Sequence, residues 1–448
     1  MNRTLEADPE AVSASHAWGT VVVLLIIGIL SYLDRNIVAL MMEPIRASLG
    51  ISDLGMGLIH GVGFGIFYAV FGLPIGYLVD RLSRRWIVYW GATAWSIAAS
   101  ACGLAGNFQQ LLIARLAVGV GEASLSPAAY SMIADLFPRR RLALALGVFG
   151  VGSVLGSAVA FIGGGAAIEY FQALGPRELP LIGMTQPWQM VFFVTGAPGI
   201  LIALLVLLIR EPRRRALRTP LPDEAASPGF ERQRLLAFMR SRWQFLTCHF
   251  LGFGFLAVAT YAGLAWIPTM LVRRFGTGIG EVGLMMGAVS LFAGIPGFLL
   301  SGWIVDRWFA AGRQDAHQRY YMIANTAAAG AAVVTFLYAP TPGLVVLGWG
   351  FITLLQPFTG PSAAQLQMVT PPHLRGQVSA VYVMVFNLMG MCLGPPLVAF
   401  ITDVVLQDTS RVHVSLAVSY GGIAALSAVI FALGLRSSRH AIANAAAD

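Results

Sequence analysis

Apolar stretches of about twenty residues, separated by short polar segments, run along almost the whole chain. A helix needs roughly 20 consecutive apolar residues to cross the hydrocarbon core of a bilayer. Six such stretches come first, and a polar segment with nine Arg residues, 210–242, follows them. The six predicted spans are 18–42, 54–79, 86–106, 111–134, 142–168 and 188–209.

The rest of the chain repeats this pattern with six more spans. One charge-free run of 55 residues, 320–374, is too long for a single helix, and the Pro-Thr-Pro-Gly sequence at 340–343 is a strong turn signal that divides it. The six further spans are 243–272, 282–305, 320–338, 344–369, 377–402 and 414–435. The pattern predicts an all-α integral membrane protein with twelve transmembrane helices in two six-helix pseudo-repeats.

Domain boundaries follow from the same alternation of apolar and polar segments. We expect a cytoplasmic N-terminal tail, a six-helix bundle, a cytoplasmic linker with one surface helix, a second six-helix bundle and a cytoplasmic C-terminal tail. Their expected ranges are 1–16, 17–209, 210–242, 243–435 and 436–448. Segment 1–16 lacks the basic n-region of a cleavable signal peptide, so the first span should stay as a membrane anchor.

Composition excludes the main soluble classes. Hydrophobic residues make up 57% of the chain and charged residues only 11%, against roughly 25% charged in a typical soluble domain. Mean hydropathy is +0.73. These values argue against a soluble enzyme, a nucleic-acid binder and a secreted disulfide scaffold. The three Cys residues lie in apolar stretches without metal or disulfide spacing, so no metal or cofactor is expected.

The net charge of +8 comes entirely from Arg, because the chain has no Lys. With both termini inside, the inner segments carry 22 Arg residues, the outer loops five and the spans two. Positive residues concentrate in the cytoplasmic loops of membrane proteins. The distribution therefore predicts a multi-pass protein of the bacterial inner membrane with both termini in the cytoplasm.

A short motif occurs at matching places in the two halves. GYLVDR at 76–81 returns as GWIVDR at 302–307, each at the end of the second span of its half. DLG at 53–55 likewise returns as EVG at 281–283. Two parallel repeats of this kind are typical of one large class of secondary transporters.

These motifs carry a family resemblance. GYLVDRLSRR at 76–85 resembles the loop 2–3 signature of the major facilitator superfamily, with Ser83 where that signature usually has Gly. Three further blocks, YLDR at 32–35, RLAVGVGEAS at 115–124 and IADLF at 133–137, resemble its Spinster-like branch. The resemblance implies transport by rocking of the two halves, a cavity lined by spans 1 and 4, and proton coupling at charged positions there.

Four charged residues lie deep in the predicted spans: Asp34, Arg35, Arg115 and Glu122. Charges at that depth are costly and usually functional. Arg115 and Glu122 are seven residues apart and therefore share one helix face. Asp34 can bond either Arg. We expect Asp34 and Glu122 to couple transport to protons, as the resemblance implies, and Arg35 and Arg115 to bind an anion through their planar guanidinium groups. The alternative is an ion-pair lattice that only joins spans 1 and 4.

The second half offers no deep charge, so its expected contribution to substrate binding is neutral. The candidates come from spans 7, 10 and 11, although each alone also fits ordinary packing: Tyr261, Trp266, Phe358, Met384, Asn387 and Met391. His60 and His249 stand alone in apolar runs and are expected to be satisfied structural groups.

Charged residues at the cytoplasmic ends are candidates for a gate. The superfamily places loops 2–3 and 4–5 side by side, so Asp80 can pair with Arg141, and Asp306 with Arg375 in the second half. Arg84 and Arg85 belong to the same expected gate, for which the alternative is purely topogenic charge.

The sequence-based hypothesis is a proton-coupled secondary active transporter of an amphipathic anionic lipid, lysophospholipid or sphingolipid-like. The alternative is a proton-coupled symporter of small organic anions or sugar acids. A ligand sensor and a membrane enzyme are less favoured, because no signalling domain and no catalytic cluster stands out. The expected partners are the substrate, protons and membrane lipids, with no nucleic acid, and the expected state is a monomer.

Overall fold

The computed structural model describes residues 14–79, 81–180, 182–212, 228–371 and 374–447. Apart from one short hairpin, every regular element within these ranges is helical. Among the described residues, eleven helical segments are long and apolar enough to cross a membrane. The twelfth is α4 (Arg84–Cys102), whose first turn carries Arg84 and Arg85. The fold expected from the apolar pattern, twelve membrane helices in two six-helix repeats, is confirmed.

The first bundle contains spans 1 to 6. In chain order these are α1 (Ala14–Leu49); α2 (Asp53–Gly57), the π-helix η1 (Leu58–Val62) and α3 (Gly63–Val79); α4; α5 (Phe108–Glu122) and α6 (Leu125–Leu136); α7 (Arg139–Leu174); and α8 (Pro187–Ala203) with the 3-10 helix η2 (Leu204–Leu208). Between spans 5 and 6, β1 (Arg177–Leu179) and β2 (Gly183–Thr185) form an antiparallel hairpin in which Arg177 pairs with Thr185.

The second bundle contains spans 7 to 12 and is preceded by α9 (Pro228–Ser241), the surface helix expected in the linker. Its elements are α10 (Trp243–Phe275); α11 (Ile279–Val289), the π-helix η4 (Ser290–Gly294) and α12 (Ile295–Ala310); α13 (Ala316–Tyr338); α14 (Pro342–Leu355) and α15 (Thr359–Val369); α16 (Arg375–Phe400) and the π-helix η5 (Ile401–Leu406); and the 3-10 helix η6 (Thr409–Arg411) with α17 (Val412–Ala447).

The last helix continues beyond residue 435, the expected end of the second bundle. Residues 436–447, expected to form a tail, continue α17 as a helix to Ala447. The apolar run ends near residue 435, but the following residues are rich in Ala, which has the highest helix propensity. Hydropathy therefore marks where the apolar span ends, not where the helix ends.

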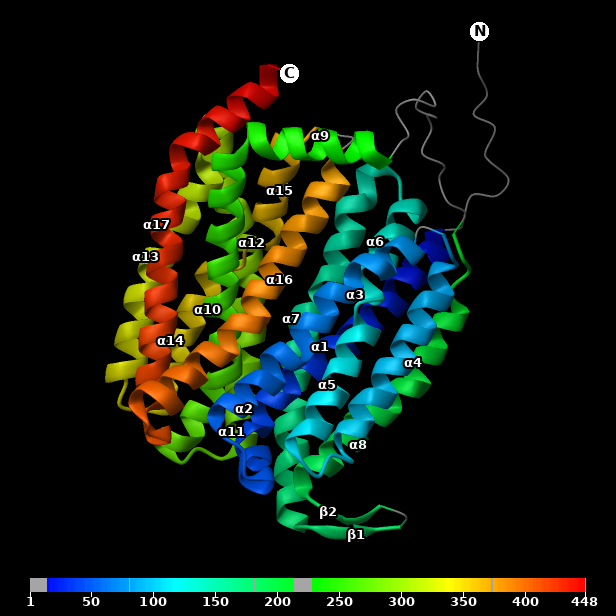
Figure 1. Cartoon of the computed structure of the whole chain (residues 1–448), viewed down its shortest axis with the longest axis vertical. Helices are drawn as coiled ribbons and strands as arrows, with labels where there is room; N and C mark the ends of the chain where they lie inside the picture. Colours follow the sequence, from blue (N-terminus) through cyan, green and yellow to red (C-terminus); the bar gives the residue numbers. More distant parts are fainter. Residues whose placement is uncertain (1–13, 80, 181, 213–227, 372–373, 448) are drawn as a thin grey trace.

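The start of α1, the end of α17 and all of α9 lie at one end of the molecule, and the β1–β2 hairpin lies at the other (Figure 1). We call these the linker end and the hairpin end. The two bundles stand side by side along the line between them, with the first half of the chain on one side and the second half on the other (Figure 1).

Glycines bring the two bundles into close contact where spans 2 and 11 cross and where spans 5 and 8 cross. A Cβ atom at Gly61 would lie 2.3 Å from the Met391 carbonyl oxygen, and one at Gly283 would lie 2.2 Å from the Phe161 carbonyl oxygen. Such contacts leave no room for a side chain at either glycine. On the span 5 side of the second crossing, a Cβ atom at Gly165 would lie 3.1 Å from the Gly283 Cα atom.

Candidate functional site: a cavity between the two bundles

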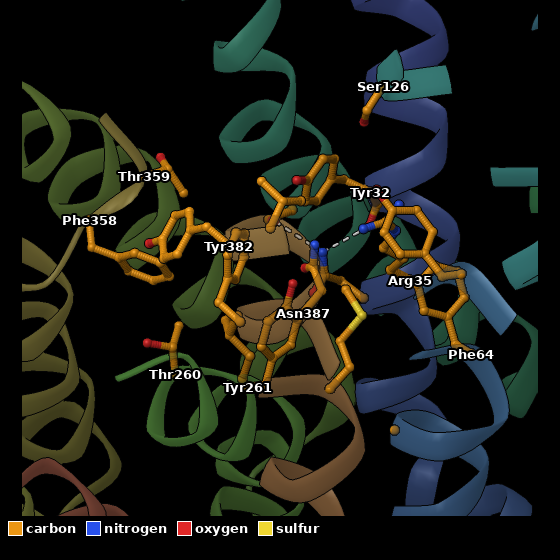
Figure 2. A pocket seen from close by; sticks show the side chains of 18 of the residues that line it. Tyr32, Arg35, Phe64, Ser126, Thr260, Tyr261, Phe358, Thr359, Tyr382 and Asn387 are labelled. Atoms are coloured by element: carbon orange, nitrogen blue, oxygen red, sulfur yellow. Dashed lines mark hydrogen bonds between the residues drawn. The ribbon is translucent and has the colours of Figure 1, made fainter. Parts of the chain in front are cut away.

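A cavity of about 590 Å³ lies between the bundles. Figure 2 shows Tyr32, Arg35 and Phe64 of the first bundle across from Tyr261 and Tyr382 of the second. On α16 the lining residues follow one helix face at spacings of three to four. They are Ser379, Tyr382, Val383, Phe386, Asn387, Met391 and Pro395. Because α16 begins at the linker end, these residues line the cavity from that end toward the glycine crossing at Met391.

The first bundle places an ion pair at the cavity wall. Arg35 Nε donates to Glu122 Oε2 over 2.6 Å, and the Ser31 hydroxyl donates to the same oxygen over 2.5 Å. The Arg35 side chain is 12% exposed, whereas that of Glu122 is fully buried. Arg35 therefore lies between the cavity and the Glu122 carboxylate.

Aromatic rings surround the Arg35 guanidinium. Its central carbon lies 5.0 Å from the ring centre of Tyr32, 4.7 Å from that of Phe64 and 4.6 Å from that of Tyr68. Rings within about 6 Å of a cation attract it through their quadrupoles. This cage holds the guanidinium at the wall and would keep it there if Glu122 released it.

Arg115 is largely buried but belongs to the same wall of the cavity. Its Nη1 donates to the Asp34 backbone carbonyl over 3.1 Å. The expected bond from the Asp34 carboxylate to either Arg is not formed in this conformation. Asp34 Oδ2, Arg115 Nε and Glu122 Oε1 are buried and have no hydrogen-bond partner among the described residues. Buried polar atoms of this kind are costly and call for an explanation such as a proton, water or ligand.

The second bundle presents a neutral wall. Phe358, Tyr382 and Phe386 pack together, with the Phe386 ring centre 5.7 Å from that of Phe358 and 5.2 Å from that of Tyr382. Hydroxyl and amide groups lie around this aromatic cluster: Thr260, Thr359, Gln367, Ser379 and Asn387. All the charged side chains that line the cavity, Arg35 and Arg115, come from the first bundle. The cavity is therefore electrically one-sided.

Most of the predicted binding residues reach this cavity. Those that line it are Arg35, Arg115, Tyr261, Phe358, Asn387 and Met391. Asp34 and Glu122 are in contact with this set but lie behind it, both buried.

Two predicted binding residues, Trp266 and Met384, do not line the cavity, and this corrects the expectation. The Trp266 indole is fully buried, and its N–H donates to the Pro395 carbonyl over 2.9 Å, which ties α10 to α16. Met384 falls outside the stripe of α16 that faces the cavity. The boundaries of a span do not determine which side of the helix faces the cavity, so the sequence could not show that Met384 points elsewhere.

Several lining residues were missed, above all aromatic ones. Tyr32 and Asn36 share the helix face of Arg35, and Phe64 and Tyr68 are four residues apart on α3. This helical spacing was the feature of the sequence from which these lining residues could have been predicted. His60 was expected to be a satisfied structural group, but it lines the cavity, and its Nδ1 has no partner among the described residues.

The other lone histidine was also expected to be a satisfied structural group, but its buried Nε2 has no hydrogen-bond partner among the described residues. His249 Nδ1 lies 3.1 Å from Gln365 Oε1, and the ring is buried among aromatic side chains of the second bundle.

At the linker end, the predicted gate residues bond within single bundles. Arg84 is buried and pairs with Asp135 and Glu211, with its Nε 2.8 Å from Glu211 Oε1. The backbone N–H of Arg85 donates to the same carboxylate over 2.9 Å. Glu211 therefore attaches the start of the linker to the first turn of α4.

The remaining predicted gate residues form no described pair. Arg141 and Asp306 are exposed, and Arg375 Nε donates to the Thr370 carbonyl over 3.1 Å. Asp306 and Arg375 do not bond one another in this conformation. Asp80 lies outside the described residues.

Ion pairs instead join the bundles at the hairpin end. Arg273 on α10 lies 2.7 Å from Glu43 on α1 and 2.6 Å from Asp53 on α2. The Leu54 backbone N–H donates to Asp403 Oδ2 on η5 over 2.6 Å. These contacts and the glycine crossings close the hairpin end, so the described conformation is one in which the cavity extends toward the linker end.

The fold and this cavity between the two bundles define a membrane transporter built from two repeats. The family model of the Major Facilitator Superfamily matches residues 24–395. The chain belongs to that superfamily, and its relatives are transporters, not enzymes.

Similar sequences include transporters from bacteria and from animals. An MFS-type efflux pump of Mycolicibacterium smegmatis is 28% identical, covering 88% of this chain and 86% of the relative. Human protein spinster homolog 1 is 29% identical, with 86% and 72% covered. A hexuronate transporter of Bacillus subtilis is 26% identical, with 85% and 86% covered. The expected resemblance to the Spinster-like branch is confirmed.

A solved structure shares the fold. The crystal structure of a bacterial homologue of the human lysosomal transporter Spinster, in an inward-facing and unoccupied conformation, superposes with a TM-score of 0.75. The two chains are 22% identical over 96% of this chain and 98% of the other.

Proposed function

We propose that the protein is a proton-coupled secondary active transporter that moves an amphipathic anionic lipid, lysophospholipid or sphingolipid-like, by alternating access. The observation that carries the proposal is the one-sided cavity. Arg35 and Arg115 lie in one wall, and the Phe358, Tyr382 and Phe386 cluster forms the other. An anionic head fits the first wall, and an acyl tail fits the second, where burial is worth about 0.8 kcal/mol per methylene.

Glu122 and Asp34 would carry the proton. Protonation of Glu122 removes the charge that holds Arg35 and frees the caged guanidinium for the anionic head. An anion bound at Arg35 and Arg115 in turn favours a proton on the carboxyl groups behind them. The two effects are one coupling free energy and must be reciprocal. Tyr261, Asn387 and Met391 would contact the part of the substrate beyond its head.

The proposed setting is the bacterial inner membrane, with the linker end in the cytoplasm. The Arg bias of 22 inner to five outer residues supports this orientation. We propose bundle boundaries at 17–209 and 243–435, a monomeric state, and a gate at the linker end in which Asp306 meets Arg375 and Asp80 meets Arg141 when the cavity opens the other way. In that state Arg84 and Arg85 would keep the loop in place through Glu211.

A second candidate is a proton-coupled symporter of small organic anions or sugar acids. The hydroxyl and amide groups that lie around the aromatic cluster favour it, since a tail-less anion needs hydrogen bonds from both walls. The hexuronate transporter among the relatives agrees with this alternative.

Uptake into proteoliposomes separates the two candidates. Lysolipids of increasing acyl length and a set of sugar acids are offered with and without a pH gradient. A lipid transporter should show affinity that rises with acyl length up to a limit, and Arg115→Ala should weaken anionic heads more than neutral ones. Transport of sugar acids with no response to any lysolipid would replace the first candidate with the second.

A further inference from the structure

A second hollow lies on the outside of the second bundle, between the first turns of α10 and the last turns of α17. Its volume is about 540 Å³, and it shares no lining residue with the central cavity. The residues that line it are Trp243, Gln244, Thr247, Cys248, Leu433, Arg436, Ser437 and His440. Since α10 begins directly after α9, the groove lies at the linker end (Figure 1).

Small residues create the groove. A Cβ atom at Gly434 would lie 2.8 Å from Cys248 Cβ, so the two helices meet closely there. Thr247, Cys248 and Ser437 contribute only short side chains beside this contact. Larger side chains stand at its edge, with Leu433 73% exposed. The result is a recess in a helix surface that otherwise faces hydrocarbon.

The groove is lined by two basic side chains that have no acidic partner among the described residues. Arg436 and His440 form no ion pair within the described part of the chain, and no acidic residue lines the recess. Arg439, one turn away, differs because it pairs with Asp315 at 3.5 Å. A guanidinium with free donors, next to hydroxyl and amide groups, suits a phosphate.

An apolar stripe leads from the groove toward the middle of the membrane. Leu426, Val429 and Leu433 are exposed on one face of α17, spaced three to four residues apart. Leu251 is exposed on α10. Trp243, 60% exposed, is the first residue of α10, and aromatic residues at the ends of membrane helices anchor to the membrane–water interface. A phosphate held at Arg436 would therefore have its acyl chains beside this stripe.

We propose that this groove binds an acidic phospholipid from the leaflet on the linker side, with the phosphate at Arg436 and His440 and an acyl chain along Leu433, Val429 and Leu426. Basic recesses between membrane helices are a known type of site for acidic head groups. The site stands apart from the transport cavity, and the lipid it holds is a resident of the membrane rather than cargo.

Native mass spectrometry of the purified protein tests the proposal. The protein is offered equal amounts of phosphatidylglycerol and phosphatidylcholine with the same acyl chains, and the ratio of the two bound lipids is measured. The unmodified protein should enrich phosphatidylglycerol. Arg436→Gln should lower the ratio about fivefold, because a basic residue near an anionic membrane contributes roughly 1 kcal/mol. His440→Gln should lower it in the same direction.

Matched variants make the result specific. Arg439→Gln removes an equal charge from the same helix and should change the ratio less than twofold. Leu433→Ser should weaken both lipids without changing their ratio. Arg115→Ala is measured in parallel, so that an acidic lipid bound in the central cavity is distinguished from one bound in this groove.

Three outcomes would overturn the proposal. Equal losses in Arg436→Gln and Arg439→Gln would reduce the effect to general surface charge. Full displacement of the lipid by millimolar inorganic phosphate would make this a free-anion site. Loss of the preference in Arg115→Ala, with Arg436→Gln unchanged, would place the acidic lipid in the central cavity.

Discussion

The four charged side chains deep in the first bundle do not satisfy all of one another's hydrogen-bonding atoms. Arg35 and Ser31 satisfy one oxygen of Glu122, but the other oxygen, Asp34 Oδ2 and Arg115 Nε are buried with no partner among the described residues. A purely structural lattice would be expected to satisfy its members, because an unpaired buried charge costs several kcal/mol. The unmet atoms support the proposal that these groups gain and lose a proton or an anion during transport.

Neutral variants of the two buried carboxylates test this explanation. Asp34→Asn and Glu122→Gln should abolish accumulation driven by a pH gradient, since neither amide can exchange a proton, while substrate exchange at equal pH should persist. Uptake and counterflow in proteoliposomes measure the two activities. Asp315→Asn, a carboxylate at the linker end outside the cavity, is the control and should keep both. Full gradient-driven accumulation in the Asp34→Asn, Glu122→Gln double variant would exclude both residues from coupling.

Glu211, at the start of the linker, should make a pH-dependent contribution to the stability of the fold. Partial burial by itself would raise the pKa of Glu211, but hydrogen bonds from Arg84, the Arg85 backbone N–H and Ser83 hold the pKa below its ordinary value of 4.5. A lowered carboxylate pKa stabilises the fold above the unfolded-state pKa, and this stability is lost as the pH falls through the folded-state pKa.

Glu211→Gln should therefore lower stability at pH 7 by at most about 1 kcal/mol, because the group is about one-third exposed. The difference from the unmodified protein should shrink as the pH falls below about 4.5, the ordinary value. Thermal unfolding in detergent at a series of pH values measures it. A difference that stays constant down to pH 3 would show that the carboxylate charge is not what stabilises this junction.

At the scale of helices, the two halves repeat their irregularities as well as their sequence. Spans 2 and 8 both change from α-helix to π-helix after the first turns, at η1 and η4. Each of these spans carries the glycine that meets the opposite bundle, Gly61 in one and Gly283 in the other. Local π-turns are common at functional sites in helices. The matched pairs of crossings, spans 2 with 11 and 5 with 8, form the contact on which the bundles would rock.

Adding a methyl group at one crossing should move the conformational equilibrium. In Gly61→Ala the new Cβ would lie 2.3 Å from the Met391 carbonyl oxygen, so the hairpin end cannot stay closed without strain. We expect at least a tenfold shift, about 1.4 kcal/mol, toward the state open at the hairpin end. Spin-label distances across both ends measure this shift.

The control for that variant is in the same span, on α3. Gly72 has no heavy atom within 4 Å of its added Cβ, so Gly72→Ala should leave the distances unchanged. If Gly61→Ala folds and shows the same distances as the unmodified protein, the crossing does not limit closure.

At the scale of the whole molecule, the ion pairs that join the bundles gather at the hairpin end. Arg273 bridges α10 to both Glu43 and Asp53 of the first bundle. Its neighbour Arg274 instead donates to the Phe336 and Leu337 carbonyls of its own bundle. Two adjacent arginines thus have separate tasks, one between bundles and one within a bundle.

This difference gives a paired prediction. Arg273→Gln should favour the state open at the hairpin end by about 1.4 kcal/mol, because it removes the cation of the second bundle from Asp53 and Glu43, which then keep only Arg46 of their own bundle. Arg274→Gln removes the same charge and should lower stability without shifting the equilibrium. Accessibility of single cysteines at the hairpin end reports the difference, and equal accessibility in the two variants would contradict the assignment of Arg273 as a latch.

A cavity residue could be predicted from the sequence only where its type is unusual in an apolar span. Arg35 and Arg115 were predicted because a charge in an apolar span has few structural explanations. Phe64, Tyr68 and His60 were missed because aromatic residues and a single histidine in an apolar span resemble ordinary packing. Trp266 was predicted wrongly as a cavity residue for the same reason, since its type fits both a binding wall and a helix contact.

The sequence by itself determined the membrane class, the number and order of the spans, the twofold repeat and the charged side of the cavity. Each depends on the apolar length of a segment or on the cost of a single buried charge, which are local properties. The tertiary structure decided which carboxylate holds Arg35, which face of α16 lines the cavity and which end of the molecule is closed. Arg273 and Asp53 are 220 residues apart, and each alone looks like an ordinary charge near the end of a span. Only the packing of two bundles at close glycine crossings brings them within bonding distance, and no local pattern encodes that distance.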